Sequence, residues 1–161
     1  MAQPPVNPRK RPSALSEAER SSMVEVEVER ELERSAGEVW AVIADFGNVS
    51  WVPGVEKVEV EEEGVGMIRH LTVPVYPPLH ERLDAIDYER MRLDYSIPAV
   101  AYLHLKNYRA RAQVVELEGE RCRLIWSGRA EADGADEAQA ATETEAFYEA
   151  IISWIDDFLK T

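Results

Sequence analysis

The sequence is poor in cysteine, positive charge and long apolar runs. Its single cysteine, Cys122, excludes an intramolecular disulfide framework and any metal centre built from cysteines. No apolar run approaches the roughly 20 residues that span a bilayer, and no apolar segment follows Met1 as in a signal peptide. We therefore expect a cytoplasmic protein without membrane insertion.

Positive charge is scarce: 18 Lys and Arg stand against 31 Asp and Glu, and the net charge is −13. Residues 1–22 carry four basic and two acidic side chains, so the remaining residues carry a net charge of −15. A surface that acidic repels nucleic-acid phosphates and anionic lipid headgroups. We therefore expect no nucleic-acid partner and no peripheral binding to membranes.

The length of 161 residues predicts one domain with a sizeable core. Residues 1–22 hold four of the nine prolines and few large apolar side chains, so we expect a disordered tail. The ordered domain is predicted to cover residues 23–161.

A strand-like alternation begins at Met23. Val24, Val26 and Val28 alternate with glutamates, which predicts a half-buried strand. Six further runs, separated by turn residues or prolines, predict a meander of strands. They cover about 54–62, 65–73, 79–87, 90–97, 107–118 and 121–132.

Helical patterns stand at both ends of this meander. Ser35-Ala36-Gly37-Glu38 matches a capping box and predicts a short helix, and 46–53 is read as a second short helix or a tight connector. A long helix is predicted from about Asp136 to Lys160, with one apolar stripe. The stripe consists of Phe147, Ile151, Trp154, Ile155 and Phe158.

This order predicts an α+β helix-grip fold, in which a seven-stranded antiparallel, curved sheet wraps around a long C-terminal helix, with two short helices after strand 1. The inward positions Ala85, Ala110 and Ala112 are small, which favours an internal cavity. In the alternative, aromatic side chains fill the space. These would be Phe147, Trp154, Tyr95 and Trp126.

Three polar residues are predicted at one end of this cavity: Arg69, Glu81 and Tyr108. If 74–78 is a loop, Leu71 faces Glu81, and Arg69 lies diagonally from Glu81 on the inner face. Buried opposite charges rarely arise for stability alone, so we interpret the pair as a ligand anchor; the alternative is a structural ion pair. The predicted apolar lining is Leu71, Val73, Leu83, Ala110, Ala112, Phe147, Ile151 and Ile155.

The order of elements, together with Glu38-Val39-Trp40, Phe46 and Trp51-Val52-Pro53-Gly54-Val55, resembles the START-like SRPBCC superfamily. That superfamily includes polyketide cyclases and dehydrases, lipid-transfer domains and plant hormone receptors. The resemblance runs from about Met23 to Leu159 and implies the helix-grip fold with a ligand cavity.

A narrower resemblance, to the abscisic acid receptors, lies in 65–69, 81–87 and 105–109. It implies a gate over the ligand at 75–79, a latch at about 103–105, and pocket roles for the matches to Arg69, Glu81 and Tyr108. The gate and latch residues would be Tyr76, Pro77, Leu79, His104 and Leu105.

This chain departs from the receptors at three pocket positions. Val52, Ala110 and Ile155 stand where the receptors have a carboxylate-binding lysine, a serine and an asparagine. The resemblance therefore implies a more apolar pocket, and neither abscisic acid nor phosphatase binding is carried over.

Two functional classes follow from the sequence. One is a carrier or sensor for a small hydrophobic molecule such as a lipid, a polyketide or an isoprenoid-like compound, without catalytic residues or a cofactor. The other is a polyketide cyclase or dehydratase that uses Arg69, Glu81 and Tyr108 for acid–base chemistry. A glutamate neutralised by an arginine is a poor base, which favours binding. The histidines are too scattered for a metal site, and His70 and His80 have the parity of the outer face.

Overall fold

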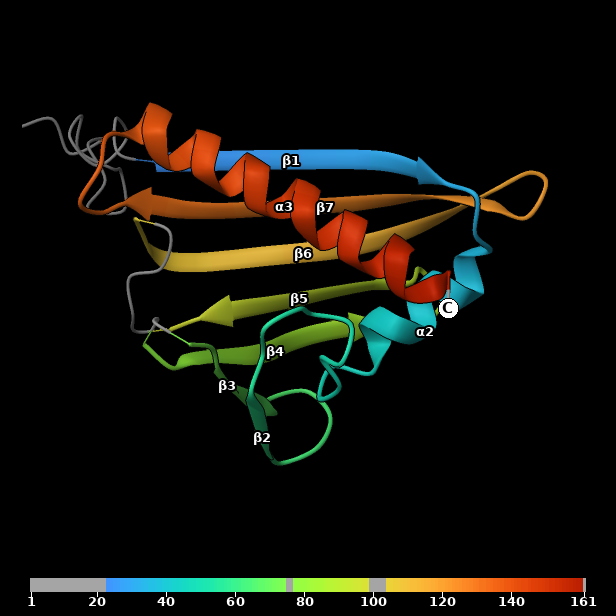
Figure 1. The fold of residues 1–161 in the computed structure, drawn as a ribbon, viewed down its shortest axis with the longest axis horizontal. Helices are drawn as coiled ribbons and strands as arrows, with labels where there is room; N and C mark the ends of the chain where they lie inside the picture. Colours follow the sequence, from blue (N-terminus) through green and yellow to red (C-terminus); the bar gives the residue numbers. More distant parts are fainter. Residues whose placement is uncertain (1–22, 75–76, 99–103, 161) are drawn as a thin grey trace, which may run out of the picture.

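The computed structural model describes residues 23–74, 77–98 and 104–160. Seven antiparallel strands form one sheet in the order β1-β7-β6-β5-β4-β3-β2, and the long helix α3 runs diagonally across one face (Figure 1). The strands are β1 (Met23–Leu32), β2 (Lys57–Glu61), β3 (Ile68–Thr72), β4 (Leu79–Asp87), β5 (Arg92–Ile97), β6 (Leu105–Leu117) and β7 (Arg121–Ala132). The helix-grip prediction is confirmed. The predicted tail, residues 1–22, lies outside the described residues.

The capping box begins helix α2 (Ala36–Ala44) as predicted. The amide of Glu38 donates to Ser35 Oγ at 3.2 Å, and that hydroxyl donates to Glu38 Oε1 at 3.0 Å. Of the two readings of 46–53, the second short helix is wrong and the tight connector agrees with the structure, since these residues form turns and bends. Asn48 Oδ1 accepts from the amide of Ser50 at 3.0 Å, and such local side-chain bonds compete with helix formation.

The register between β3 and β4 also corrects the prediction. Leu71 pairs with Leu79, and Arg69 therefore lies directly opposite Glu81 instead of diagonal to it. The connection is longer than predicted because β3 ends at Thr72, and the prolines that follow cannot donate to a ladder.

Ala85 does not point inward. The pairing of β4 with β5 shifts between Leu83 and Ala85, so the alternation changes sides at this bulge. Ala85 is exposed, and Ile86 packs against the core in its place.

Helix α3 (Glu137–Leu159) begins at Asp136, whose Oδ1 accepts from the amide of Gln139 at 2.7 Å. Its inward face is rotated from the predicted stripe: Phe147 and Trp154 are half-buried and meet edge to face, and Phe158 is 39% exposed. No helix in the described part of the chain is long and apolar enough to cross a membrane. The buried residues of α3 are Ala140, Thr144, Tyr148, Ile151, Ile152 and Ile155.

Two sets of contacts fix the position of α3 on the sheet. A Cβ atom at Gly128, in β7, would lie 1.8 Å from Tyr148 Oη, so only glycine leaves room for this hydroxyl. At the β1 edge, Arg30 donates to Ser153 Oγ at 3.0 Å and to the Glu149 carboxylate at 2.7 Å. The space at Gly128 and the contacts with β1 therefore decide which side of α3 faces the sheet.

Candidate ligand-binding site

Arg69 and Glu81 form a buried ion pair on the inner face of the sheet. Each is 7% exposed, and Arg69 Nε donates to Glu81 Oε1 at 2.8 Å. Arg69 Nη1 also donates to the carbonyl oxygen of Phe46 at 2.8 Å, and its guanidinium carbon lies 3.8 Å from the centroid of the Phe46 ring. The turn after α2 thus holds the arginine through a second hydrogen bond, in addition to the one to Glu81.

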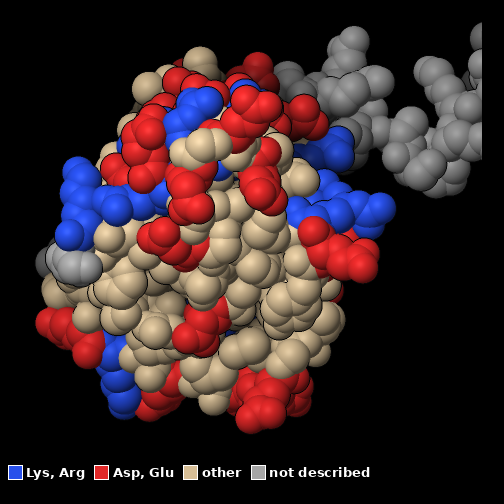
Figure 2. All heavy atoms as spheres, turned by 90° about the vertical axis from the view of Figure 1, so that its right-hand side faces the viewer, with Lys and Arg blue, Asp and Glu red and all other residues tan. Residues whose placement is uncertain are grey.

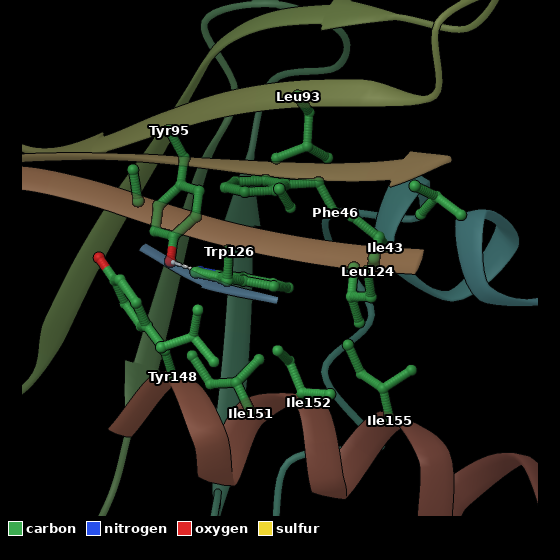
Figure 3. Close-up of a cluster of buried hydrophobic side chains, with 14 of the residues drawn as sticks. Ile43, Phe46, Leu93, Tyr95, Leu124, Trp126, Tyr148, Ile151, Ile152 and Ile155 are labelled. Atoms are coloured by element: carbon green, nitrogen blue, oxygen red, sulfur yellow. Dashed lines mark hydrogen bonds between the residues drawn. The ribbon is translucent and has the colours of Figure 1, made fainter. Parts of the chain in front are cut away.

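Hydroxyl groups from the sheet and from α3 meet beside this pair. Tyr108 Oη and Tyr148 Oη are 2.6 Å apart. Trp126 Nε1 donates to Tyr95 Oη at 3.0 Å (Figure 3). The sequence reasoning missed Tyr148 as a site residue and treated Tyr95 and Trp126 only as possible fillers. The glycine in the middle of a long strand, Gly128, was the signal that a side chain approaches there.

The Arg69–Glu81 ion pair and the cluster of tyrosine hydroxyls lie along one side of the interior, with Tyr95 between them. The Tyr95 ring lies 6.1 Å from Phe46 and 6.2 Å from Tyr108, centroid to centroid, and Arg69 Cζ is 5.7 Å from the Tyr95 centroid. An oxygen atom of a ligand near Tyr95 would therefore have both guanidinium and phenol donors close by.

Burial strengthens the hold of these phenols on their protons, which a tyrosine already keeps at neutral pH. It raises the pKa of Tyr95, and the negative charge of Glu81 adds to the shift. Burial likewise raises the pKa of Tyr108 and of Tyr148 above the ordinary value of 10.0. All three phenols therefore keep their protons at neutral pH and can donate hydrogen bonds.

The residues predicted to line the cavity mostly lie on the inner face. Val73 and Phe147 are only half-buried. Ile151 and Ile155 project from α3 toward the sheet, across from Tyr95 and Trp126 (Figure 3). Of the four aromatics in the filled-interior alternative, Tyr95 and Trp126 do lie inside. The buried members of the predicted lining are Leu71, Leu83, Ala110, Ala112, Ile151 and Ile155.

Of the hollows lined by described residues, two do not lie between the sheet and α3. One is on the outer face of the sheet. The other, of about 360 Å³, lies between α2 and the C-terminal end of α3, where it is lined by Val42, Trp51, Phe158 and Leu159 among others. Figure 2 shows this end of the molecule, with a broad uncharged surface edged by Asp and Glu. The enclosed pocket stays a prediction.

The gate and latch residues have different surroundings. Leu79 begins β4 and is buried. Leu105 is a core residue and begins β6, which therefore starts two residues earlier than predicted. Leu105 is thus a strand residue and not a loop residue. His104 is exposed, and its Nδ1 lies 2.8 Å from Glu143 Oε2 of α3. Pro77 is exposed, whereas Tyr76 and 99–103 lie outside the described residues. Opening and closing of these segments stays a prediction.

A bulge between Lys106 and Arg109 brings Leu105 and Tyr108 to the same face. Asn107 stands at this bulge with a φ of 54°, in the left-handed region that asparagine tolerates better than most residues. The segment Lys106-Asn107-Tyr108, within the matched range 105–109, thus has a local structural role: its bulge aims the Tyr108 phenol into the interior.

His70 and His80 lie on the outer face, as their parity predicts. They are partners across β3 and β4, with ring centroids 4.7 Å apart, and His70 Nε2 contacts the Glu61 carboxylate. Within residues 23–74, 77–98 and 104–160, no group of three His, Cys, Asp or Glu side chains could hold a metal ion.

Solved structures share this fold at low sequence identity. A protein of Bacillus thuringiensis is 21% identical, with a TM-score of 0.76 over 86% of this chain and 100% of that one. Protein XoxI of Bacillus cereus is 22% identical, with a TM-score of 0.74 over 83% and 94%. Norcoclaurine synthase of Thalictrum flavum, in complex with dopamine and hydroxybenzaldehyde, is 19% identical, with a TM-score of 0.66 over 98% and 96%.

No curated protein sequence matches the chain. The narrower likeness to the abscisic acid receptors stays a prediction. Residues 23–158, which include every described strand and nearly all of α3, match the family described as polyketide cyclase / dehydrase and lipid transport. With the helix-grip fold and the buried polar wall on its inner face, the chain therefore belongs to this family of the SRPBCC superfamily.

Proposed function

We propose that the protein binds a small, mostly apolar molecule between the sheet and α3, as a carrier or sensor. The observation that carries this proposal is the buried wall of polar groups, Arg69, Glu81 and Tyr108, on the inner face of an otherwise apolar core. The family description, which includes lipid transport, supports the same class of ligand.

The energetics of burial support a functional reading of this wall. An ion pair taken out of water loses solvation that its mutual attraction rarely repays, and an apolar pair of similar volume would often be at least as stable. Phenols that keep their protons are hydrogen-bond donors for a ligand oxygen. We therefore infer a ligand with an apolar body and one hydroxyl, carbonyl or carboxylate group, such as a lipid, a polyketide or an isoprenoid-like compound.

The second candidate is a cyclase or dehydratase that uses the same interior. It is favoured by the family description and by norcoclaurine synthase, an enzyme with a similar fold. However, the Glu81 charge is already offset by Arg69, and the neighbouring phenols are protonated. This arrangement suits the holding of an oxygen atom more than the removal of a proton, so we favour binding.

A ligand screen by thermal denaturation tests the proposal. Fatty acids, isoprenoids and aromatic polyketides are added to the wild type, to Tyr108→Phe and to Glu81→Gln. A ligand that binds the native state raises Tm in proportion to ln(1 + [L]/Kd). We expect at least one compound class to raise the wild-type Tm, and both variants to respond less. Product analysis of the same mixtures would reveal a catalyst.

Tyr88→Phe is the matched control, because Tyr88 is 66% exposed and the change removes the same hydroxyl. It should respond as the wild type does. If Tyr108→Phe and Glu81→Gln also respond to every such compound as the wild type does, the polar wall is structural and the proposal fails.

A further inference from the structure

The outer face of the sheet carries a row of basic side chains around one serine. Four strands contribute one residue each: Arg82 pairs with Ser96, Ser96 with Arg109, and Arg109 with Arg129. Successive strands lie about 4.8 Å apart, so the guanidinium groups of Arg82 and Arg109 can both reach over Ser96. Three arginines therefore meet on one rung in a protein whose net charge is −13.

The charges on this rung are not balanced. Arg82 Nε lies 2.8 Å from Asp84 Oδ1, and Arg129 Nε lies 3.3 Å from Glu25 Oε1. The guanidinium of Arg109 forms no hydrogen bond or ion pair with any residue that the structure describes, and it stands directly opposite Arg129. Like charges directly opposite in a sheet destabilise it. The rung thus has an excess of positive charge centred on Arg109.

Ser96 is the second, independent observation. It is 4% exposed, and its Oγ is the one buried side-chain oxygen or nitrogen, among the described residues, without a hydrogen-bond partner. Its neighbours Tyr95 and Ile97 point into the core, so Ser96 points to the outer face, toward the arginines. Burial of an unsatisfied hydroxyl is costly, and a ligand that accepts a hydrogen bond from it would remove that cost.

A hollow of about 580 Å³ opens on the same rung. Arg109 and Arg129 line it, and so does Arg111, two residues further along β6. Arg111 donates two hydrogen bonds to the Asp94 carboxylate, at 2.7 and 3.0 Å. We propose that this hollow binds the oxyanion group, phosphate, sulfate or carboxylate, of a small soluble molecule. Arg109 lines the hollow and would donate two hydrogen bonds to the anion. Ser96, the partner of Arg109 on β5, lies beside the hollow and not in its lining, and its hydroxyl would donate one to an anion that reaches onto this rung.

The rim restricts the size and charge of the ligand. Four acidic residues, Glu25, Glu27, Asp84 and Asp94, also line the hollow, so an extended polyanion or an anionic membrane would be repelled at its edges. Arg129 and Arg111 are paired with Glu25 and Asp94. The guanidinium of Arg109, which has no partner among the described residues, remains available to one compact anion. This site lies on the face of the sheet opposite to α3 and is independent of the apolar ligand proposed above.

Titration of the full chain with inorganic phosphate at low ionic strength tests this inference, by NMR of the backbone amides and by Tm. Sulfate and acetate are parallel arms, and vesicles containing phosphatidic acid are the membrane arm. We expect saturable shifts at Ser96 and Arg109 and a rise in Tm. Arg109→Gln should weaken binding about tenfold, since a hydrogen bond to a charged group is lost. Arg123→Gln is the matched control: it makes the same change of charge on the outer face of the sheet, in β7, and should bind nearly as the wild type does.

Ser96→Ala separates ligand binding from a structural role. Without phosphate its Tm should equal or exceed that of the wild type, because an unsatisfied buried hydroxyl is removed, and its phosphate affinity should fall severalfold. Equal losses in Arg109→Gln and Arg123→Gln would indicate nonspecific attraction and overturn the inference. So would a lower Tm of phosphate-free Ser96→Ala, or binding to vesicles without any response to the small anions.

Discussion

Replacement of Gly128 by alanine tests how the sheet accommodates α3. The added Cβ would meet Tyr148 Oη at 1.8 Å, Tyr148 Cζ at 3.0 Å and the Arg109 carbonyl oxygen at 3.4 Å. The Tyr148 ring is rigid and fully buried, and its hydroxyl is held by Tyr108, so it cannot turn aside cheaply. Either the ring or the helix must move.

The size of the effect follows from opposing contributions. Overpacking of a core costs about 1–3 kcal/mol, and loss of the Tyr108–Tyr148 hydrogen bond adds about 0.5–1.5 kcal/mol. Replacement of glycine at an allowed φ stabilises the protein by about 0.4–1 kcal/mol, because it lowers the conformational entropy of the unfolded chain. We expect a net loss of about 2 kcal/mol in the free energy of unfolding, or a Tm lower by roughly 4–8 °C for a chain of this size.

Urea denaturation followed by circular dichroism measures this loss. Gly37→Ala is the matched control, because nothing lies within 4 Å of its added Cβ in α2, and it should be neutral or stabilising. Tyr148→Phe removes the nearest atom, so the double variant with Gly128→Ala should lose less than the sum of the single variants. A neutral or stabilising Gly128→Ala would refute the close approach of Tyr148 to β7.

Four further predictions concern other parts of the protein. Arg69→Met should cost about 3–5 kcal/mol by leaving the Glu81 carboxylate buried and unpaired, and Arg69→Met combined with Glu81→Leu should be clearly more stable in the same urea assay. Below pH 10 the protonated tyrosines of the site contribute their full stability; above it the unfolded chain loses these protons first, so the urea midpoint should fall as pH rises. A flat midpoint between pH 9 and 11 would contradict their burial. Burial raises the pKa of the Cys122 thiol to about 11, so a thiol reagent at pH 8 should label it only after denaturation. Ser35→Ala should cost about 1 kcal/mol as a lost N-cap, and no loss of thermal stability would show that α2 does not need this cap.

Much of the fold could be predicted from local patterns. The alternation in β1 and β6 and the caps at Ser35 and Asp136 are local signals, and the structure agrees with them. The rotation of α3 could not be predicted in this way. Phe147, Trp154 and Phe158 are the largest apolar residues of the helix, yet a glycine in a distant strand and contacts with β1 decide which side faces the sheet.

The candidate site shows the same limit. Arg69 and Glu81 were identified from the parity of two strands, but their direct pairing depends on a loop length that Pro-containing segments do not specify. The turn carbonyl of Phe46 and the hydroxyl of Tyr148 come from elsewhere in the chain. A bulge such as the one beside Leu83 changes which residues point inward and has no single sequence signature.

Contacts between a bound ligand and the methyl groups of the core test the central claim most directly. A compound that raises Tm is added to protein with labelled Ile, Leu and Val methyl groups, and intermolecular NOEs are recorded. The account predicts NOEs from the apolar part of the ligand to Leu83, Ile151 and Ile155, which are buried between the sheet and α3. NOEs only to the exposed Val60 and Val65 would contradict binding in the interior.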